Sequence, residues 1–367
     1  MPTIDVLLPS PLRGSGGHRT IVANAEALAA AGSRVRLHVQ RQRRQRDPVS
    51  KTRAWYPVQS CEVHSGWPDR LSDSDALMAT AWFTATHALG VQTDAKRLYF
   101  VQDYEPLFHP AGDLAVAAAA TYSAGFVSVV IGRWLQHRLL TDHAQHAWSV
   151  PFTADLDVYA PGRQSRGRRV VAVYQPDKPR RCPVLMLATL RELLGRGVEV
   201  VTIGGTKDPR LGAGHKHLGI LPVAQLSRLY AESAAGLCLS ASNPSRIPFE
   251  MMAAGMPFVD LHLPNTVYDY PEQGCELAHP EPQALADAVE RVMAQPALGE
   301  YGAHYMRDRP ATAEADAFVA FVEDVLTGVA PAAPPRTPAY AREPAGEPGA
   351  WTPLTPTGSP VTRLLRR

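Results

Sequence analysis

A single carboxylate interrupts the apolar stretch "NPSRIPFEMMAAGMP", which covers residues 243–257. Glu250 is this carboxylate, and the stretch closes with Gly255 and Pro257. A carboxylate in a short helix packed against a sheet costs on the order of several kcal/mol unless it is paired. We therefore expect Glu250 either to reach solvent or to have a partner.

The loop "PDKPRR", residues 176–181, places three cations on a proline-stiffened turn. Lys178, Arg180 and Arg181 follow directly after a strand predicted at 169–174. Without a metal site, a diphosphate leaving group needs such cations or a helix N-terminus to neutralise its developing charge. An exposed basic turn is the alternative, but the position at a strand end favours phosphate binding.

Two further loops could carry chemistry. In "YFVQDYEP" a predicted strand ends in Asp103, Tyr104 and Glu105, which could bind sugar hydroxyls or a cationic transition state, or could cap the next element. In "GSGGHR" the amides of Gly16 and Gly17, which precede a predicted helix, could hold a phosphate or a sugar hydroxyl. A purely structural tight turn explains the glycines equally well.

Several enzyme classes are excluded by their missing motifs. The chain has no His-Glu-x-x-His zinc motif, no Gly-x-Ser-x-Gly elbow and no Gly-Lys-Ser/Thr phosphate loop. Arg19 occupies the third glycine position of a dinucleotide fingerprint, so that motif fails as well. The four cysteines lie far apart and indicate neither a zinc site nor a disulfide scaffold, so no metal is predicted.

The elements that must position these loops alternate between strand and helix. The first half opens with a strand at 4–8, a helix at 20–31 and a strand at 35–39, a unit typical of a parallel sheet. The second half continues with strands at 169–174, 198–203, 236–240 and 257–261 and helices at 184–194, 224–235, 248–254 and 282–293. This pattern predicts an α/β fold with two facing Rossmann-like domains and a ligand site in the cleft between them.

The expected domain boundaries follow from this pattern. Residues 1–160 would form an N-terminal Rossmann-like domain, and residues 161–311 would form a C-terminal one. A C-terminal helix at 312–328 could return to the N-terminal domain. The remainder, 329–367, is rich in Pro and Ala and is predicted to be a disordered tail.

Composition places few limits on partners. The formal net charge of +2 gives no reason to expect nucleic acid, and the N-terminus resembles a first strand and not a signal peptide, so a cytoplasmic location is expected. Residues 114–131 carry no charge, and we interpret them as a buried helix followed by a buried strand, not as a membrane span. The basic run at 41–46 is interpreted as a solvated loop, with peripheral contact to anionic lipid at the inner membrane as the alternative.

Residues 236–261, "GLCLSASNPSRIPFEMMAAGMPFVDL", resemble the donor-binding region of retaining, family-4-like glycosyltransferases of the GT-B fold. These enzymes share a Pro-x-x-Glu-x-Met-Ala-x-Gly-x-Pro pattern, matched here, with one residue less between Pro and Glu, by Pro248, Glu250, Met252, Ala253, Gly255 and Pro257. Together with "YFVQDYEPLFHPAG" and "LGILPVAQLSRLY", the region is similar to the WsaF-like bacterial rhamnosyltransferases that use dTDP-L-rhamnose. The resemblance covers residues 4–326.

The resemblance implies an EC 2.4 hexosyltransferase that needs no metal or cofactor. The donor would be held mainly by the second domain and the acceptor by the first. Glu250 would bind the nucleotide sugar. The diphosphate would meet Arg180, Arg181, Ser245, the helix amides from Ile247, and Gly16 and Gly17. Asp103, Tyr104 and Glu105 would line the sugar or acceptor side.

The implied function is transfer of a deoxyhexose, with L-rhamnose from dTDP-L-rhamnose favoured, to a glycan or lipid-linked acceptor with retention of configuration. Two departures from the family pattern leave the donor open. Ser242 stands where the broader family has a second Glu, and Gln175 stands where the narrower group has an Arg. A UDP- or GDP-hexose donor is therefore one alternative, and a non-catalytic binding subunit is another.

Overall fold

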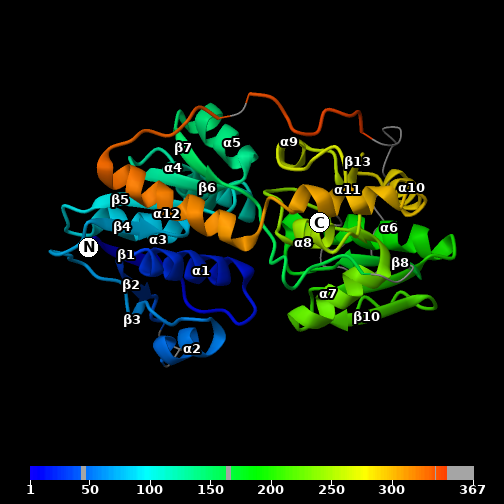
Figure 1. Ribbon diagram of the computed structural model, residues 1–367, viewed down its shortest axis with the longest axis horizontal. Coiled ribbons are helices and arrows are strands. Elements are labelled where there is room, and N and C mark those ends of the chain that lie inside the picture. Colours follow the sequence, from blue (N-terminus) through cyan, green and yellow to red (C-terminus); the bar gives the residue numbers. More distant parts are fainter. Residues whose placement is uncertain (43–46, 163–166, 335, 345–367) are drawn as a thin grey trace, which may run out of the picture. The chain divides into compact units, whose positions relative to one another are not determined.

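The computed structural model describes residues 1–42, 47–162, 167–334 and 336–344. The chain divides into two compact units (Figure 1). Unit 1 consists of Met1–Thr153 and Arg309–Pro338, and unit 2 consists of Ala154–Asp308 and the residues from Ala339 onwards. The chain therefore passes between the units three times, at 153/154, 308/309 and 338/339.

Unit 1 is built on a parallel sheet with the strand order β3-β2-β1-β4-β5-β6-β7. Its strands are β1 (Thr3–Leu8), β2 (Arg34–Val39), β3 (Glu62–Ser65), β4 (Ala76–Ala79), β5 (Lys96–Val101), β6 (Val127–Ile131) and β7 (Ala147–Val150). The helices are α1 (Gly16–Ala30), α2 (Pro48–Trp55), α3 (Trp82–Gly90), η1 (Glu105–Phe108), α4 (Asp113–Thr121), α5 (Arg133–His143) and α12 (Ala311–Thr327). Continuous apolar runs such as β4 form its interior, as expected for parallel strands covered on both faces.

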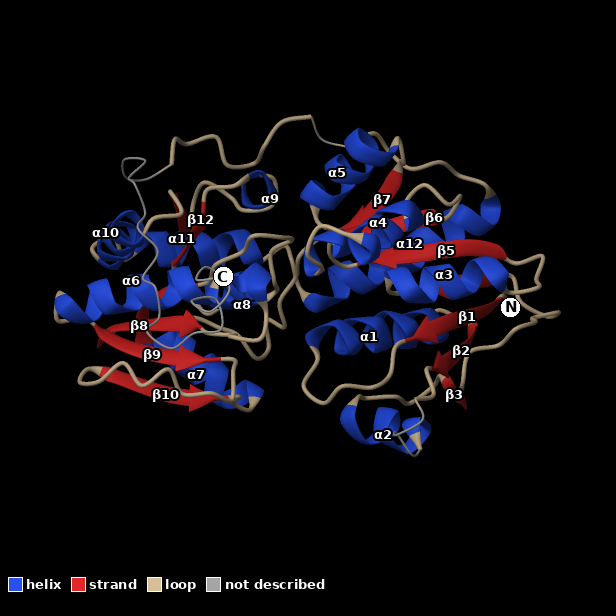
Figure 2. Ribbon diagram, turned by 180° about the vertical axis from the view of Figure 1, so that it is seen from behind, coloured by secondary structure: helices blue, strands red, loops and turns tan. Residues whose placement is uncertain are grey.

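Unit 2 has a second parallel sheet, with the strand order β10-β9-β8-β11-β12-β13. Its strands are β8 (Gly167–Val173), β9 (Glu199–Ile203), β10 (His215–Gly219), β11 (Ser233–Leu237), β12 (Phe258–Leu261) and β13 (Cys275–Ala278). The helices are η2 (Pro179–Arg181), α6 (Pro183–Gly195), α7 (Val223–Glu232), α8 (Ile247–Ala253), α9 (Pro264–Val267), α10 (Pro282–Met293) and α11 (Ala297–Met306). In Figure 2 the strands of each unit lie between helices.

The predicted α/β class with two Rossmann-like sheets is confirmed. The order reverses beside β1 in unit 1 and beside β8 in unit 2, so each sheet is doubly wound. The second-half strand predicted at 236–240 instead begins at Ser233. Its predicted start was too late because Ser233, Ala234 and Ala235 carry no strong strand signal, although Ser233 and Ala235 pair with β8 and are buried.

The last helix, α12, belongs to unit 1. Glu314 is buried there and accepts hydrogen bonds from Asn24 and Thr153, each at 3.1 Å. The Phe318 ring lies 4.9 Å from that of Phe100 in β5. Figure 1 shows α12 beside α1, which it contacts. Because the paired carboxylate and the aromatic rings are all buried, α12 is part of the unit 1 core.

One prediction about residues 114–131 is wrong. β6 is buried as expected, but α4 is largely exposed, with only Ala118 and Thr121 buried among its residues. The absence of charge indicated burial, yet alanine is small enough to lie on a surface at little cost. Among the helices of the described residues, none is long and apolar enough to cross a membrane.

The predicted disordered tail also needs correction in part. Tyr340 is 3 % exposed and packs on unit 2, where its hydroxyl accepts a hydrogen bond from the Leu277 amide of β13 at 3.2 Å. The amides of Ala339 and Tyr340 both donate to the Val267 carbonyl of α9. This docked segment is short and bordered by Pro and Ala, so its composition does not indicate that it packs on unit 2. Residues 345–367 of the tail and 43–46 of the predicted basic run lie outside the described residues.

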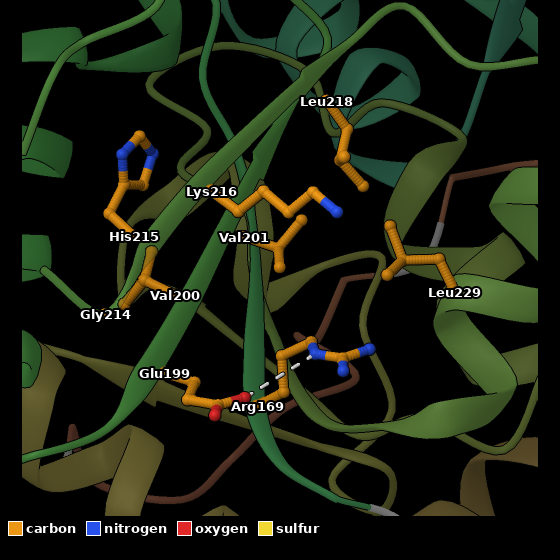
Figure 3. Close-up of a pocket in the computed structure, with 9 residues that line it drawn as sticks. All are labelled: Arg169, Glu199, Val200, Val201, Gly214, His215, Lys216, Leu218 and Leu229. Carbon is orange, nitrogen blue, oxygen red and sulfur yellow. Dashed lines mark ion pairs between the residues drawn. The ribbon is translucent and has the colours of Figure 1, made fainter.

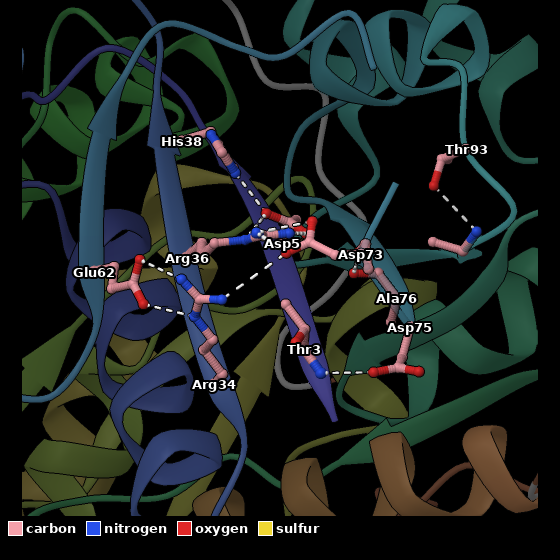
Figure 4. A network of polar contacts seen from close by, with 12 residues as sticks. Thr3, Asp5, Arg34, Arg36, His38, Glu62, Asp73, Asp75, Ala76 and Thr93 are labelled. Carbon is pink, nitrogen blue, oxygen red and sulfur yellow. Dashed lines mark hydrogen bonds and ion pairs between the residues drawn. The ribbon is translucent and has the colours of Figure 1, made fainter. Parts of the chain in front are cut away.

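A buried ion-pair network ties the first strands of unit 1 together (Figure 4). Asp5 of β1 is fully buried and accepts hydrogen bonds from Arg36 Nε at 2.7 Å and Arg36 Nη2 at 2.6 Å. His38 Nε2 lies 2.6 Å from Asp5 Oδ1, and Arg36 also pairs with Asp73 at 2.9 Å. Burial alone would raise the pKa of Asp5, but the hydrogen bonds from His38 and Arg36 lower it to about 2.

We expect Asp5→Asn to lower the free energy of unfolding by about 3–5 kcal/mol, because it leaves the buried Arg36 guanidinium without its main partner. A carboxyl whose pKa is lowered stabilises the fold above its unfolded pKa of about 3.9 and loses this contribution as pH falls toward 2. Urea titrations between pH 7 and pH 2 should therefore show a pH dependence that is weaker in the variant.

Asp73→Asn is the matched control, because Asp73 pairs with the same arginine while its side chain is 58 % exposed. We expect it to cost about 0–1 kcal/mol. Equal losses for the two substitutions would show that the buried pair does not stabilise unit 1.

Tyr340→Ala should lower the free energy of unfolding of unit 2 by about 3–5 kcal/mol, since it removes a buried aromatic ring. Tyr340→Phe should cost about 1 kcal/mol, since it leaves the Leu277 amide of an edge strand without its acceptor. Val329→Ala, at a 52 % exposed position of unit 1 just after α12, is the control. Urea unfolding curves that do not distinguish Tyr340→Ala from the control would contradict the docking of this segment.

Candidate functional site

The basic loop begins where β8 ends, as the sequence predicts, but its three cations differ in environment. Arg181 is 7 % exposed, and its guanidinium donates to Ser240 Oγ at 2.9 Å and to the Asn243 carbonyl at 3.2 Å. The amide of Ala241 donates to the Arg180 carbonyl at 2.9 Å. The loop after β8 is thus joined to the loop after β11 by both side-chain and backbone hydrogen bonds. Arg181 acts here as a brace between them.

Lys178 and Arg180 give this edge its positive charge. Partial desolvation and the nearby charges of Arg180 and Arg181 lower the pKa of Lys178. Arg180 is half-buried. Cations held this close repel each other, and a bound anion would relieve that repulsion. The arrangement is therefore suited to an anionic ligand at the carboxyl end of β8.

A buried aspartate holds the turn that follows β11. Asp260 Oδ1 accepts hydrogen bonds from the amides of Ser240 and Leu261, each at 2.7 Å, and Oδ2 accepts from Tyr270 at 2.9 Å. Burial raises the pKa of Asp260 to about 6, although these hydrogen bonds oppose the rise. Asn265 Nδ2 donates to the carbonyls of Ser240 and Ser242 at 2.8 and 2.6 Å. We call the turn from Ser240 to Asn243 the β11 turn. Asp260, Asn265 and Arg181 each form hydrogen bonds with it.

Glu250 lies downstream of the β11 turn, in the first turn of α8. The side chains of Met251 and Met252 are fully buried, and Glu250 is 8 % exposed. Its negative charge contributes to the raised pKa values of Tyr230 and Cys238, after the larger effect of their burial. Of the two expectations from the sequence, a solvent-exposed carboxylate is therefore excluded. Glu250 is held within unit 2.

Ser245 and Ile247 occupy the connection between the β11 turn and α8. Ser245 is half-buried, with its Oγ 3.8 Å from Cys238 Sγ, and Ile247 is the first residue of α8. Six predicted donor-site residues are therefore gathered in two joined loops and the short helix that follows them: Lys178, Arg180, Arg181, Ser245, Ile247 and Glu250.

Two histidines of β10 contact Thr202 of β9, and the sequence analysis did not single them out. His215 Nε2 and His217 Nδ1 each lie 2.9 Å from Thr202 Oγ1. Within the described part of the chain, the buried His217 Nε2 has no hydrogen-bond partner. A β-carbon on Gly205 would lie 2.8 Å from the Tyr174 carbonyl, so only glycine allows this turn to touch the start of the basic loop. "HKHLG" resembles any edge strand, so no sequence signal marks His217.

In unit 1, Gly16 and Gly17 form the first turn of α1, where Ser15 Oγ accepts from the His18 amide at 3.4 Å. A β-carbon at Gly16 would meet nothing within 4 Å, and one at Gly17 would make ordinary contact with Gln102, the residue after β5. Packing therefore does not require glycine at either position. The structure brings Gly17 next to the loop that carries Asp103.

The predicted catalytic residues of unit 1 are all buried. Glu105 Oε2 accepts a hydrogen bond from the Trp82 amide at 2.7 Å, so Glu105 caps α3. Tyr104 places its hydroxyl 2.9 Å from His143 Nε2 and its ring under Arg138, at 4.8 Å. Asp103 Oδ1 accepts from the Tyr104 amide at 2.9 Å. The capping alternative from the sequence named the next element, but Glu105 caps the preceding helix α3, which gives this carboxylate a structural role.

A hollow of about 330 Å³ lies elsewhere in unit 2 (Figure 3). It is lined by Arg169, Glu199, Val200, Val201, Gly214, His215, Lys216, Leu218 and Leu229, and includes none of the predicted site residues. Arg169, Glu199 and Gly214 lie near the amino ends of β8, β9 and β10, opposite to the basic loop. Among the described residues, no three His, Cys, Asp or Glu side chains form a group that could hold a metal ion.

Comparison with known proteins identifies relatives of this chain. Residues 168–290 match the family described as "WsaF, C-terminal domain". The chain is 34 % identical over 257 residues to the O-antigen biosynthesis protein RfbC of Myxococcus xanthus. This similarity covers 66 % of the chain and 20 % of that relative, so the match spans about a fifth of the relative's length.

Solved structures show the same fold at low identity. Sucrose-phosphate synthase from Thermosynechococcus elongatus has a TM-score of 0.68 at 15 % identity, covering 89 % of this chain and 99 % of the synthase. Anabaena Alr3699/HepE, solved with UDP and glucose, has a TM-score of 0.66 at 13 % identity, covering 90 % and 100 %. S. aureus TarM, solved with UDP, has a TM-score of 0.68 at 6 % identity, covering 89 % and 100 %. The GT-B fold class predicted from the sequence is thus confirmed, and residues 168–290 match the WsaF C-terminal domain.

Proposed function

We propose that this protein is a glycosyltransferase of polysaccharide biosynthesis that transfers L-rhamnose from dTDP-L-rhamnose, with retention of configuration, to a glycan or lipid-linked acceptor. The observation that carries the proposal is the basic loop with Lys178 and Arg180, which hydrogen bonds join to the braced β11 turn, upstream of the buried Glu250. The WsaF C-terminal match covers these residues, and the relative RfbC is named for O-antigen biosynthesis.

Donor binding would use each of these groups differently. Lys178 and Arg180 would neutralise the diphosphate, and a bound dianion would raise the lowered pKa of Lys178. Arg181 would hold the basic loop and the β11 turn together. Glu250 would accept hydrogen bonds from ribose or sugar hydroxyls. The half-buried imidazole of His217, in the neighbouring strand β10, would contact the nucleobase.

The transfer step in this proposal requires no cofactor or metal. The departing phosphate oxygen would take the acceptor proton, so no side-chain base is needed, and the cations of unit 2 would stabilise the charge left on that oxygen. In unit 1, Asp103 and Tyr104 would line the acceptor side, Glu105 would position them through α3, and Gly16 and Gly17 would offer amides. We place the reaction in the cytoplasm, on the inner face of the membrane.

A UDP- or GDP-hexose donor is the second candidate. Ser242, at the position of the broader family's second Glu, is fully buried, and its carbonyl accepts from Asn265. Ser242 takes part in the hydrogen bonds that hold the β11 turn. The sugar would therefore be bound by other residues than in the broader family. Anabaena Alr3699/HepE, which shares the fold, was solved with UDP-glucose.

The decisive experiment is thermal stabilisation of the full chain by nucleotide sugars, followed by a transfer assay. A ligand at a hundred times its dissociation constant adds about 2.7 kcal/mol of stability. We expect dTDP-L-rhamnose to stabilise more than dTDP, and Arg180→Ala to weaken dTDP binding by roughly 10- to 100-fold, because it removes charge-assisted hydrogen bonds.

Arg168→Ala is the matched control, since Arg168 lies at the amino end of the same strand and should leave dTDP binding unchanged. Glu250→Gln should reduce transfer. If only a UDP- or GDP-hexose stabilises the chain, that nucleotide sugar replaces dTDP-L-rhamnose as the proposed donor. No response to any nucleotide sugar would identify a non-catalytic subunit.

His217→Ala should weaken dTDP binding by about 3- to 10-fold, the value of one neutral hydrogen bond. It should not change binding of inorganic pyrophosphate, which has no base. His215→Ala is the control, because His215 shares the Thr202 hydroxyl but lies closer to the amino end of β10. Isothermal titration that shows equal losses for both variants, or a loss of pyrophosphate binding, would make the role of His217 structural.

A further inference from the structure

Residues 9–15 connect β1 to α1 and are here called the β1 loop. The loop follows β1 at the place where the strand order of unit 1 reverses, which is where open parallel sheets bind their ligands. Leu12, Arg13 and Gly14 at its tip are exposed, so burial does not hold them. Exposed loops are mobile unless other interactions restrain them. The β1 loop therefore needs hydrogen bonds to keep one conformation.

One imidazole joins the two ends of the β1 loop. His18, in the first turn of α1, places Nε2 at 3.1 Å from the Ser10 carbonyl and 3.4 Å from the Pro9 carbonyl. Its Nδ1 lies 2.9 Å from Ser15 Oγ, and its amide donates to the same oxygen at 3.4 Å. The first residues of the loop and the last one are thus held by the same side chain.

The partners of His18 determine which ring nitrogen carries the proton. Carbonyl oxygens can only accept hydrogen bonds, so Nε2 must donate to Ser10. Burial lowers the pKa of His18, although its hydrogen bonds to Pro9 and Ser10 oppose this, so the ring is neutral at pH 7. Nδ1 of the neutral ring is then an acceptor for the Ser15 hydroxyl. Both nitrogens are therefore used, in a single tautomer.

Tyr56 restrains both the ring of His18 and the middle of the β1 loop. Tyr56 is 5 % exposed, and its ring stacks on the imidazole with 5.7 Å between the centroids and 11° between the planes. Its hydroxyl donates to the Leu12 carbonyl, which also accepts from the Ser15 amide at 3.1 Å. The start, middle and end of the loop are therefore all tied to the stacked pair of His18 and Tyr56.

The residues that follow the β1 loop depend on these contacts. Ser15 is the N-cap of α1, and Gly16 and Gly17 are its first helical residues. The first amides of a helix have no acceptor within the helix and carry the positive end of its dipole. Because Ser15 determines where α1 begins, the contacts of His18 with Ser10 and Ser15 also determine where the amides of Gly16 and Gly17 lie.

We propose that His18 is a positioning residue of the transfer reaction, which holds the β1 loop so that the amides of Gly16 and Gly17 meet the substrate in a fixed geometry. This rests on the proposed function, in which those amides take part. His18 would act through Ser10 and Ser15 and not by proton transfer, since both its ring nitrogens already have partners. A displacement of about 1 Å at such a site can lower the rate roughly 100-fold.

Hydrogen exchange of the full chain tests whether His18 holds the loop. We expect His18→Ala to speed exchange of the amides in residues 9–17 by roughly 5- to 30-fold, the effect of losing one or two hydrogen bonds. Tyr56→Phe keeps the stacked ring but removes the bond to Leu12, so its effect should be smaller. His64→Ala changes an exposed histidine of β3 in the same unit and is the matched control, which should leave this exchange unchanged.

Release of dTDP from dTDP-L-rhamnose, with water as the acceptor, tests the role in the reaction; another nucleotide sugar replaces it if only that one stabilises the chain. The bond from the sugar to the diphosphate breaks, water oxygen bonds the anomeric carbon, and the departing phosphate oxygen takes the water proton. In His18→Ala we expect kcat to fall on the order of tenfold or more, with KM little changed. His18→Gln can still donate to Ser10 and should recover part of both losses.

Both His18 variants should keep their stabilisation by dTDP, which shows that they are folded. Unchanged exchange in His18→Ala would overturn the proposal, because the loop would not depend on this side chain. Faster exchange with an unchanged kcat would overturn it as well, because the order of the loop would not serve the reaction. An unchanged protein that releases no nucleoside diphosphate would leave His18 a structural role only. The proposed function fails in addition if no nucleotide sugar stabilises the chain.

Discussion

The basic loop and the β11 turn of unit 2 depend on the buried carboxylate of Asp260. Its two oxygens hold the amides of Ser240 and Leu261 and the hydroxyl of Tyr270, and this fixes the position of the β11 turn. Arg181 then joins that turn to the basic loop. Since an unpaired carboxylate or guanidinium would be costly at such burial, these partners are mutually required. Lys178, Arg180 and Glu250 are carried on the elements that this network positions.

Buried carboxylates with hydrogen-bond donors also join elements of unit 1. Asp5 binds β1 to β2 through Arg36, Glu105 caps α3 through the Trp82 amide, and Glu314 binds α12 to the rest of the unit. Each of these three carboxylates is buried and has hydrogen-bond donors, so all three act as structural links. For this reason an acidic cluster at a strand end is weak support for a catalytic role.

The surface of unit 1, in contrast to these buried polar links, carries exposed apolar side chains on α4. α4 has apolar residues and few buried ones, while its neighbour α5 carries cations. Leu114 and Val116 of α4 are 54 % and 69 % exposed, and single apolar side chains at a surface are normal for a globular protein.

The sequence by itself determined the doubly wound sheets, because apolar runs of strand length alternate with helical periodicity whatever the neighbours are. It also determined that Lys178, Arg180 and Arg181 follow a strand end, which is a local relation. Only the tertiary structure decided that Arg181 is a brace, that Glu250 is buried, that α4 is exposed and that Tyr340 docks on β13. Each of these depends on residues far away in the chain, and local pattern does not encode which distant groups will meet.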